Sequence, residues 1–364
     1  MATHSEIYDK LAEKYNLVGD AHFIELLETY MTPEEGKYLL ELSTPKTPAE
    51  LAQTLNLDEQ TVADKLDNLT RRGLLFRGKT QYLAWGNAHQ LNVRVMYSGN
   101  EYTPPNLLDM RRKDLRYASS PYAEINGWFK MFERTGKQLI RIIPARKAIA
   151  TNPDIRPEQV LWYEDIVEIM QRVDKIGVID CDCRKIYQRC DKPLLTCLNL
   201  GKTMIDYEVG RGGRMKVITL EEAIEISDGA EEAGLVHNTP GNNASLPGIV
   251  CNCCNDCCSV FEPALQSGRF YDVVAPSRFQ ASVNQELCKG CEKCYKRCPF
   301  GAIEMVKVDG SKKMKAKVIQ EKCMGCGVCV IGCKRKAITF NLVRPPEFIP
   351  PKPQMGQPLI YNVY

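Results

Sequence analysis

Residues 288–299 read CKGCEKCYKRCP, and residues 323–334 read CMGCGVCVIGCK. Both stretches place four cysteines in the pattern CxxCxxCxxxC, so one spacing occurs twice in the C-terminal part of the chain. Chance does not easily produce such a repeat. Cysteine thiolates are soft metal ligands, and the short turns between them wrap the chain around one corner of a metal centre. The repeat therefore predicts two cysteine-bound metal centres, and it decides the fold of this region.

The kind of metal centre follows from the number and spacing of the thiolates. Each run offers four soft ligands, as an iron–sulfur cluster requires, and the backbone amides of the CxxC turns can donate hydrogen bonds to sulfide. The fourth cysteine of a run does not easily reach the cluster that the first three bind. We therefore expect two iron–sulfur clusters in this region.

These residues resemble the bacterial ferredoxins that carry two [4Fe-4S] clusters. Pro299 follows the first run, and Gly290 and Gly325 relieve crowding inside the loops, whereas Lys334 stands where the second run usually has proline. The resemblance implies a ferredoxin-like βαββαβ domain over residues 276–343, in which the two clusters exchange their fourth ligands. It assigns Cys288, Cys291, Cys294 and Cys333 to one cluster, and Cys323, Cys326, Cys329 and Cys298 to the other.

Nine further cysteines precede this region. Adjacent cysteines cannot both point at one small site without strain, so Cys253 and Cys254, or Cys257 and Cys258, should face different metal centres or divide between metal and core. We expect one or two additional iron–sulfur clusters here, although one cluster with structural thiols, a cluster of unusual shape or a zinc site also fits. The pairing of ligands stays open among Cys181, Cys183, Cys190, Cys197, Cys251, Cys253, Cys254, Cys257 and Cys258.

The composition narrows the class of protein. The 364 residues are 44% apolar and 26% charged with a net charge of +3, which is typical of a multidomain globular chain and gives no overall electrostatic argument for nucleic acid. No apolar stretch is long enough to span a membrane, and the N-terminus does not resemble a signal peptide. We therefore expect a cytoplasmic protein whose 17 cysteines bind metal rather than form disulfides.

The pattern along the chain predicts an α+β, multidomain protein. A helical and winged-helix domain should occupy residues 1–90, and a helical connector residues 91–179. A small α/β domain rich in cysteine, which we expect to bind iron–sulfur clusters, should occupy residues 180–275. The ferredoxin-like domain follows over residues 276–343, and the proline-rich tail at 344–364 should be extended.

The N-terminal domain carries two repeated helix starts. Thr32 and Thr47 are each followed by proline and, three residues later, by glutamate, which is the pattern of a capping box. A third helix from Asp58 should end at Gly73, and a two-stranded hairpin should follow. This order resembles the winged-helix fold.

The charge of the third helix argues against DNA binding. A helix that reads DNA normally presents basic and amide groups, but this helix carries four acids, which would repel phosphate. We therefore expect the winged helix to dock a protein partner or a second copy of the chain, with nucleic acid as the less favoured partner. The four acids are Asp58, Glu59, Asp64 and Asp67.

Together these features favour electron transfer as the function. We expect low-potential single electrons to pass through two ferredoxin-type clusters, and through further clusters upstream, to or from a partner oxidoreductase or flavoprotein in anaerobic metabolism. One alternative is a reductase or activating enzyme with a catalytic cluster in residues 181–258, and another is a redox-sensing transcription regulator. A cysteine-rich unit before a ferredoxin pair also resembles iron–sulfur binding proteins of anaerobes, a resemblance that names no reaction.

Overall fold

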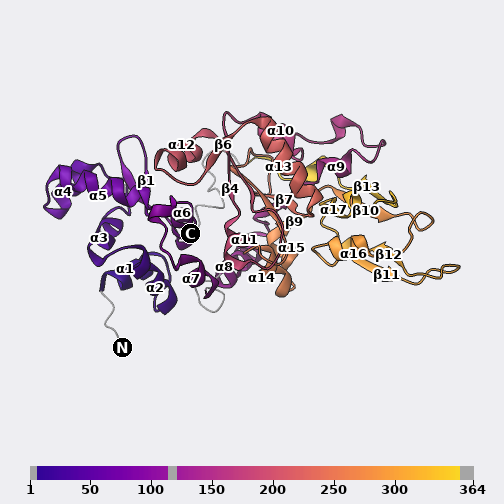
Figure 1. Ribbon diagram of the computed structural model, residues 1–364, viewed down its shortest axis with the longest axis horizontal. Coiled ribbons are helices and arrows are strands. Elements are labelled where there is room, and N and C mark those ends of the chain that lie inside the picture. The colour runs from indigo at the N-terminus through magenta and orange to yellow at the C-terminus, as the bar shows by residue number, and fades with distance from the viewer. Residues whose placement is uncertain (1–5, 114–120, 353–364) are drawn as a thin grey trace. The chain divides into compact units, whose positions relative to one another are not determined.

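A computed structural model describes residues 6–113 and 121–352 of the chain (Figure 1). The protein is a mixed α+β molecule with several sheets, and it divides into two compact units. Among the described residues, the first unit contains residues 6–113, 121–124 and 203–216. The second unit contains residues 125–202 and 217–352.

The first unit is mainly helical. The predicted capping boxes are present at Thr32 and Thr47, and each begins a helix with proline in its first turn. A two-stranded antiparallel hairpin follows the fifth helix, with Phe76 opposite Leu83. The elements are α1 (Glu6–Lys14), α2 (Ala21–Tyr30), α3 (Pro33–Glu41), α4 (Pro48–Leu55), α5 (Glu59–Arg71), β1 (Leu75–Arg77), β2 (Tyr82–Ala84), α6 (Ala88–Met96), η1 (Asn100–Tyr102) and α7 (Leu107–Lys113).

A later segment of the chain completes the first unit. Helix α12 (Lys202–Gly210) returns to the hairpin, where the hydroxyl of Tyr207 donates to the carbonyl of Leu75 at 2.6 Å. Glu208 is fully buried and is paired with Arg94 at 2.8 Å and with Arg211 at 2.6 Å. A buried carboxylate is stable only when it is paired in this way, so these ion pairs fix α12 against the N-terminal residues.

The second unit is built on a seven-stranded sheet with the order β6-β4-β5-β8-β7-β3-β9. The pairs β3–β7, β4–β5, β5–β8 and β7–β8 are antiparallel, and the pair β3–β9 is parallel. The strands are β3 (Ile140–Ile142), β4 (Ile176–Asp180), β5 (Leu195–Leu200), β6 (Lys216–Ile218), β7 (Val236–Pro240), β8 (Ile249–Cys253) and β9 (Val274–Ala275).

Two of these strands correct the sequence-based prediction. Residues 91–179 were expected to form a helical connector, but they contain β3 and most of β4, which are integral to the sheet. The helical elements between these two strands are short, and they include η3 (Pro157–Gln159) and α10 (Ile166–Gln171). Short apolar runs do not distinguish a buried strand from a buried helix, and this ambiguity explains the difference.

Short helices surround the sheet. Helix α13 begins with a capping box at Thr219, and Gly234 follows its end with a positive φ of 75°. The other helices are α8 (Pro121–Thr135), α9 (Arg146–Ile149), α11 (Asp182–Tyr187), α13 (Leu220–Glu232), α14 (Phe261–Gln266) and α15 (Phe270–Val273).

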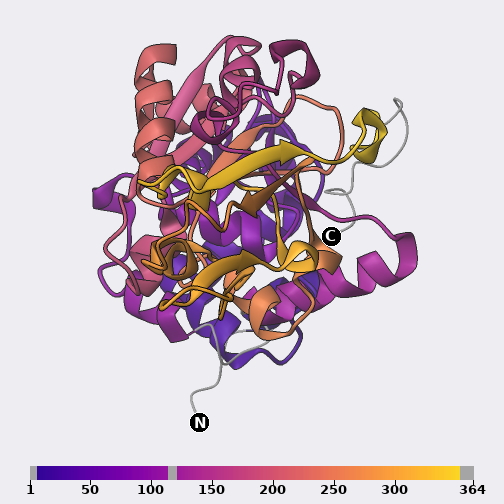
Figure 2. The same cartoon turned by 90° about the vertical axis from the view of Figure 1, so that its right-hand side faces the viewer.

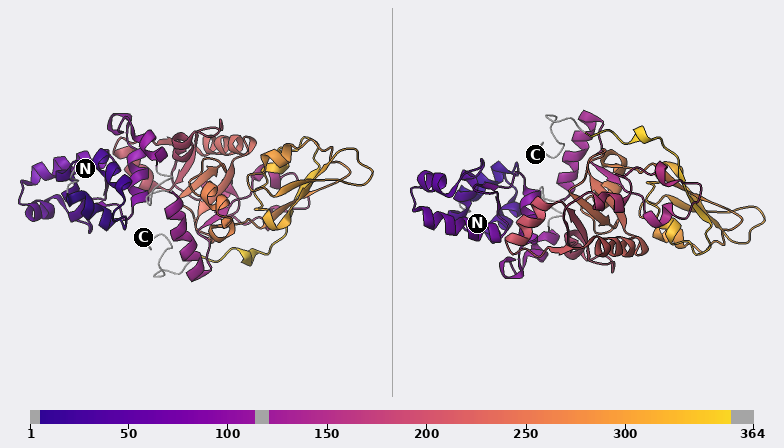
Figure 3. Two further views of the ribbon diagram at one scale, coloured as in Figure 1. Left: turned by 90° about the horizontal axis from the view of Figure 1, so that it is seen from below. Right: turned by 90° about the horizontal axis from the view of Figure 1, so that it is seen from above.

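The C-terminal part of the second unit has the order strand, helix, strand, strand, helix, strand. Strand β10 pairs with β13 and β11 pairs with β12, both antiparallel, so the first and last strands meet. Figure 2 shows these orange to yellow elements facing the viewer, and Figure 3 shows them gathered at one end of the unit. They are β10 (Phe279–Val283), α16 (Lys293–Arg297), β11 (Ile303–Val306), β12 (Lys315–Val318), η4 (Gln320–Lys322), α17 (Val328–Ile331) and β13 (Ile338–Leu342).

This C-terminal part shares one apolar core with the seven-stranded sheet. The backbone amide of Ala145 donates to the carbonyl of Cys326 at 3.0 Å, and Arg297 donates to the carbonyl of Glu232 at 2.8 Å. After β13 the chain forms the short turn η5 (Pro346–Phe348), and residues 353–364 of the predicted extended tail lie outside the described residues. Within residues 6–113 and 121–352, none of the helices combines the length and apolar character needed to cross a membrane.

Replacing Thr47 by alanine tests whether the capping boxes stabilise the first unit. Thr47 Oγ1 accepts from the amide of Glu50 at 3.2 Å, and its loss should destabilise α4 by about 1 kcal/mol. The amides of α4 should then exchange with solvent roughly fivefold faster in a hydrogen-exchange measurement. The control is Thr54→Ala on the exposed side of the same helix, which should not accelerate exchange because alanine favours helix. Equal exchange in both variants would contradict the assignment.

Candidate metal centres

The cysteines of the two repeated runs line two cavities in the C-terminal part. The first cavity contains an exposed cysteine, Cys291, and has a charged rim that includes Lys289, Lys293 and Lys313. The cysteines on its wall are Cys288, Cys291, Cys294 and Cys333. Three of them come from the first run and the fourth from the second run.

The second cavity is the apolar counterpart of the first. Phe300, Met324 and Val328 line it, and its three cysteines from the second run are buried. Its cysteines are Cys298, Cys323, Cys326 and Cys329, so here the fourth comes from the first run. Each cavity thus gathers the four cysteines that the resemblance assigns to one cluster; their binding of a cluster stays a prediction.

The two cavities are built by matching local contacts. The amide of Ala302 donates to Sγ of Cys298, and the amide of Ala337 donates to Sγ of Cys333, both at 3.3 Å. Gly290 and Gly325 have positive φ values of 63° and 65°, and a Cβ on either would lie 2.1 Å from a backbone oxygen. Glycine is therefore required at both loops, because a carbonyl oxygen of another segment occupies the place of a side chain.

Burial disfavours the charged form of these thiols. It raises the pKa of Cys294 to about 11, and it raises the pKa values of Cys326 and Cys329 further above the usual range. A bound cation reverses this effect, because a thiol that coordinates a metal loses its proton. These cysteines are therefore suited to ligation and poorly suited to act as free thiolates.

The nine upstream cysteines separate into two groups within the second unit. In the six-cysteine group, Sγ of Cys258 lies 3.4 Å from Sγ of Cys253, and Cys183 contacts both Cys258 and Cys181. Hydrogen bonds from Cys181 and Cys258 lower the pKa of Cys183, so this thiol is the readiest of the group to ionise. The group consists of Cys181, Cys183, Cys197, Cys251, Cys253 and Cys258.

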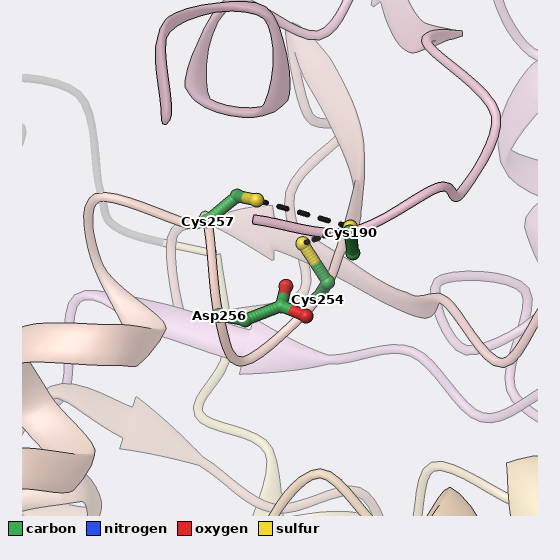
Figure 4. Close-up of side chains that lie close together, drawn as sticks. All are labelled: Cys190, Cys254, Asp256 and Cys257. Carbon is green, nitrogen blue, oxygen red and sulfur yellow. Dashed lines mark hydrogen bonds between the residues drawn. The ribbon is translucent and has the colours of Figure 1, made fainter. Parts of the chain in front are cut away.

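The three-cysteine group consists of Cys190, Cys254 and Cys257. Sγ of Cys190 lies 3.9 Å from Sγ of Cys254 and 3.8 Å from Sγ of Cys257. A carboxylate oxygen of Asp256 joins them, and the four ligand atoms lie within 4.8 Å of one another. In Figure 4 the three sulfurs face a common point, with the carboxylate of Asp256 beside Cys254.

The alternation of side chains along strand β8 explains why adjacent cysteines belong to different groups. Residues alternate between the two faces of a strand, so Cys251 and Cys253 share one face of β8. In β5 and β8, Leu198 lies opposite Val250, and the same antiparallel register places Cys197 opposite Cys251. The side chains of Cys197 and Cys251 are hydrogen bonded. Cys254, just past the strand, turns to the other group, as the sequence predicted for neighbouring cysteines.

Some residues of these sites were not predicted from the sequence. Asp256 was missed, although its place inside CCNDCC is the signal that points to it. Arg184, which is buried and lies 3.9 Å from Sγ of Cys254, carries no recognisable pattern. The ring nitrogens of the buried His237 contact Asn252 and Glu231.

Aromatic rings connect the six-cysteine group to the second cavity. The amide of Phe261 donates to Sγ of Cys258 at 3.5 Å, and the Phe261 ring lies 5.8 Å from the ring of Phe300, centroid to centroid. Phe300 in turn lines the second cavity. Phe270 packs against both rings, at 5.1 and 5.2 Å. A continuous contact of buried aromatic rings therefore joins the two cysteine sites.

Comparison with known proteins bears on the C-terminal part. Residues 281–340 match a family model described as a 4Fe-4S dicluster domain. A stretch of 55 residues is 38% identical to Translation initiation factor RLI1 of Chaetomium thermophilum, covering 15% of this chain. The chain spans only 9% of that protein's length, so the likeness is local. The family match, together with the cysteines, marks this chain as an iron–sulfur protein.

The variant Gly325→Ala tests how tightly the second cavity is built. A Cβ at this position would meet the carbonyl oxygen of Phe279 at 2.1 Å and Oγ of Ser277 at 2.3 Å, which the loop cannot accommodate without moving its cysteines. We expect about half of the ferredoxin-type iron to be lost, measured by iron and sulfide analysis after anaerobic purification.

Gly310→Ala is the matched control for this loop. Gly310 also has a positive φ, 76°, but nothing lies within 4 Å of its added Cβ. It should carry only the backbone cost of about 1 kcal/mol and keep its iron. Full iron content in the Gly325 variant would show that the loop is not constrained as described.

Proposed function

We propose that this protein transfers single electrons through two [4Fe-4S] clusters held in the two C-terminal cavities. The observation that carries the proposal is that each cavity is lined by four cysteines, three from one CxxCxxCxxxC run and one from the other. Thiolate-bound [4Fe-4S] clusters exchange one electron at a time, and their potentials depend on hydrogen bonds to sulfur and on burial. The backbone amides that donate to Sγ of Cys298 and to Sγ of Cys333 are such hydrogen bonds to sulfur.

The two cavities differ in a way that supports a direction for the transfer. The first has lysines on its rim and an exposed cysteine, whereas the second is apolar and lies beside the aromatic contact to the six-cysteine group. We infer that the redox partner docks at the first cavity, and that its docking surface is acidic because it meets Lys289, Lys293 and Lys313. An oxidoreductase or flavoprotein of anaerobic metabolism suits this role.

We further propose that the six-cysteine group binds an additional iron–sulfur cluster. Six thiolates exceed the four that one tetrahedral ion accepts, so a polynuclear centre is the economical explanation of their clustering. Electrons would pass between it and the second cavity along Phe261 and Phe300, whose rings lie 5.8 Å apart. A cluster with an open iron site at this position would instead support a reductase or activating enzyme.

The α3–α5 helices and the β1–β2 hairpin would, in this proposal, form a winged helix that docks protein. The acids of α5 favour protein docking over DNA binding, because they form ion pairs with nearby basic side chains. Asp67 pairs with Arg71 at 2.8 Å and with Arg77 at 3.5 Å. Arg72 pairs with the buried Glu35 at 2.8 Å. Few cations of this helix are thus left to meet phosphate, which disfavours a redox-sensing regulator.

Substitution of Cys298 tests the exchange of ligands between the clusters. Cys298→Ser should alter the same EPR signal as Cys326→Ser, because both residues line the second cavity. Cys294→Ser should alter the other signal, although Cys294 lies only four residues from Cys298. Iron analysis of the unsubstituted chain should give at least about eight atoms, as two cubanes require.

The contrary outcome is easily recognised. If Cys298→Ser and Cys294→Ser perturb one common signal and leave the other intact, each run binds its own cluster and the proposed exchange is wrong. A total near eight iron atoms would in addition contradict the proposed upstream cluster, but it would agree with the two ferredoxin-type clusters.

A DNA-binding screen at low salt separates protein docking from transcription regulation. The chain should show only weak, sequence-independent binding that disappears as salt is raised, because α5 presents acids beside its basic groups. The double variant Asp64→Lys, Asp67→Lys is an internal comparison that should strengthen this non-specific binding. Tight binding to one sequence by the unsubstituted chain would reverse the order of the two hypotheses.

A further inference from the structure

The three-cysteine group differs from both cavities in its dimensions. We propose that Cys190, Cys254, Cys257 and Asp256 bind a single zinc ion in a tetrahedral site, separate from every iron–sulfur cluster of the chain. Zinc has no redox chemistry in proteins, so this site would not carry electrons. The inference therefore goes beyond electron transfer and does not depend on it.

The distances between the sulfurs favour one metal ion over a cluster. Zinc–sulfur bonds of about 2.3 Å in a tetrahedron place neighbouring sulfurs about 3.8 Å apart. Sγ of Cys190 lies 3.9 Å from Sγ of Cys254 and 3.8 Å from Sγ of Cys257. The iron and sulfide atoms of a cubane would hold its cysteine sulfurs much farther apart, around a cavity. The sulfur–sulfur distances of the group therefore fit one metal ion.

The ferredoxin-type cysteines provide the contrast within the same chain. Among the described residues, none of the eight makes a sulfur–sulfur hydrogen bond, and they surround cavities instead. The cysteines of the two runs thus line cavities, whereas the three-cysteine group is spaced for one ion. That difference is a property of the backbone turns that hold the sulfurs. The six-cysteine group also has a short contact, 3.4 Å between Sγ of Cys253 and Sγ of Cys258, but it has more thiolates than one ion binds.

Asp256 supplies the fourth ligand. Its carboxylate lies within 4.8 Å of all three sulfurs, and it projects from the turn that also carries Cys254 and Cys257 (Figure 4). Its Oδ1 atom is buried and has no hydrogen-bond partner within the described part of the chain. A buried carboxylate oxygen without a partner is costly, and a zinc ion would satisfy it at the ordinary ligand distance of about 2.0–2.2 Å.

The surrounding charges match such a site. Three thiolates and one carboxylate carry more negative charge than one zinc ion neutralises. The buried guanidinium of Arg184 lies 3.9 Å from Sγ of Cys254, and the carbonyls of Asn252 and Pro193 hold it at 2.8 and 3.0 Å. The amide of Arg189 donates to Sγ of Cys257 at 3.4 Å. Donors of this kind stabilise and orient metal ligands.

The position of the site indicates a structural role. Cys190 lies in the loop after α11, and its two sulfur partners lie 64 and 67 residues further along the chain. A metal that joins such distant segments stabilises the folded state, because it binds the assembled site and not the unfolded chain. Cys253 and Cys258 flank the same turn, so the zinc ion would also fix two ligands of the six-cysteine group.

Adjacent cysteines provide matched variants for the test. Zinc and iron are measured together by mass spectrometry on the full chain, produced with both metals in the medium and purified without oxygen. The unsubstituted chain should contain one zinc per chain. Cys254→Ser should lose zinc, whereas Cys253→Ser, one residue away, should keep zinc and change the iron content. Cys257→Ser and Cys258→Ser should repeat this contrast.

Zinc affinity tests the fourth ligand in a chain that keeps all its cysteines. In competition with a chromophoric chelator, Asp256→Ala should bind zinc at least about tenfold more weakly, and Asp256→Cys should retain tight binding. Cobalt(II) added in place of zinc should give the absorption bands of a tetrahedral thiolate site, which Asp256→Ala should shift. This measurement also decides the matter if a cysteine variant fails to fold.

Three outcomes would overturn the proposal. The first is a chain without zinc whose Cys254→Ser variant loses iron, since the group would then belong to a cluster. The second is equal loss of zinc from Cys254→Ser and Cys253→Ser, and the third is unchanged zinc affinity in Asp256→Ala. None of these results would contradict the two proposed ferredoxin-type clusters, because their iron and EPR signals are measured independently in the same samples.

Discussion

A thiol inside a protein carries a stable charge only beside a cation, and the second unit depends on this constraint. Burial raises the pKa of Cys326 and Cys329, so without metal these groups are neutral and their loops lack the interaction that fixes them. As the proposed metal ligands they would lose their protons, and the free energy of metal binding would then contribute to the free energy of folding. The amide donors on Cys298 and Cys333 lower the remaining cost of gathering negative sulfurs in an apolar core.

The second constraint is the alternation of side chains along a strand. It assigns Cys251 and Cys253 to one face of β8, so the turn after the strand must carry Cys254 and Cys257 to a different place. One short segment can then supply cysteines to two groups of different size. Two cysteines of the three-cysteine group, Cys254 and Cys257, pack against Ala230 near the end of α13 and Leu235 just before β7. Cys253 and Cys258 belong instead to the large apolar core that contains the second cavity.

The sequence predicted the features whose causes are local. The capping boxes at Thr32 and Thr47, the end of a helix at Gly73 and the repeated cysteine runs all depend on residues within a few positions of one another. The sheet of the second unit was not predictable in this way. Strand β3 has three residues, and its partners β7 and β9 come about a hundred residues later, so only tertiary packing makes it a strand. Likewise, nothing local joins Cys190 to Cys254, 64 residues away.

In the proposed assignment, the three-cysteine group and the clusters serve two kinds of metal chemistry within one unit. An electron carrier needs clusters in apolar contact, and Phe261, Phe270 and Phe300 provide that contact between the six-cysteine group and the second cavity. It also needs those clusters to stay fixed while their charge changes, because a ligand that moves with each electron slows the transfer. In our proposal, a zinc ion beside Cys253 and Cys258 would meet this need, since its own charge never changes. The three-cysteine group would then act as the rigid support of the proposed electron-carrying sites.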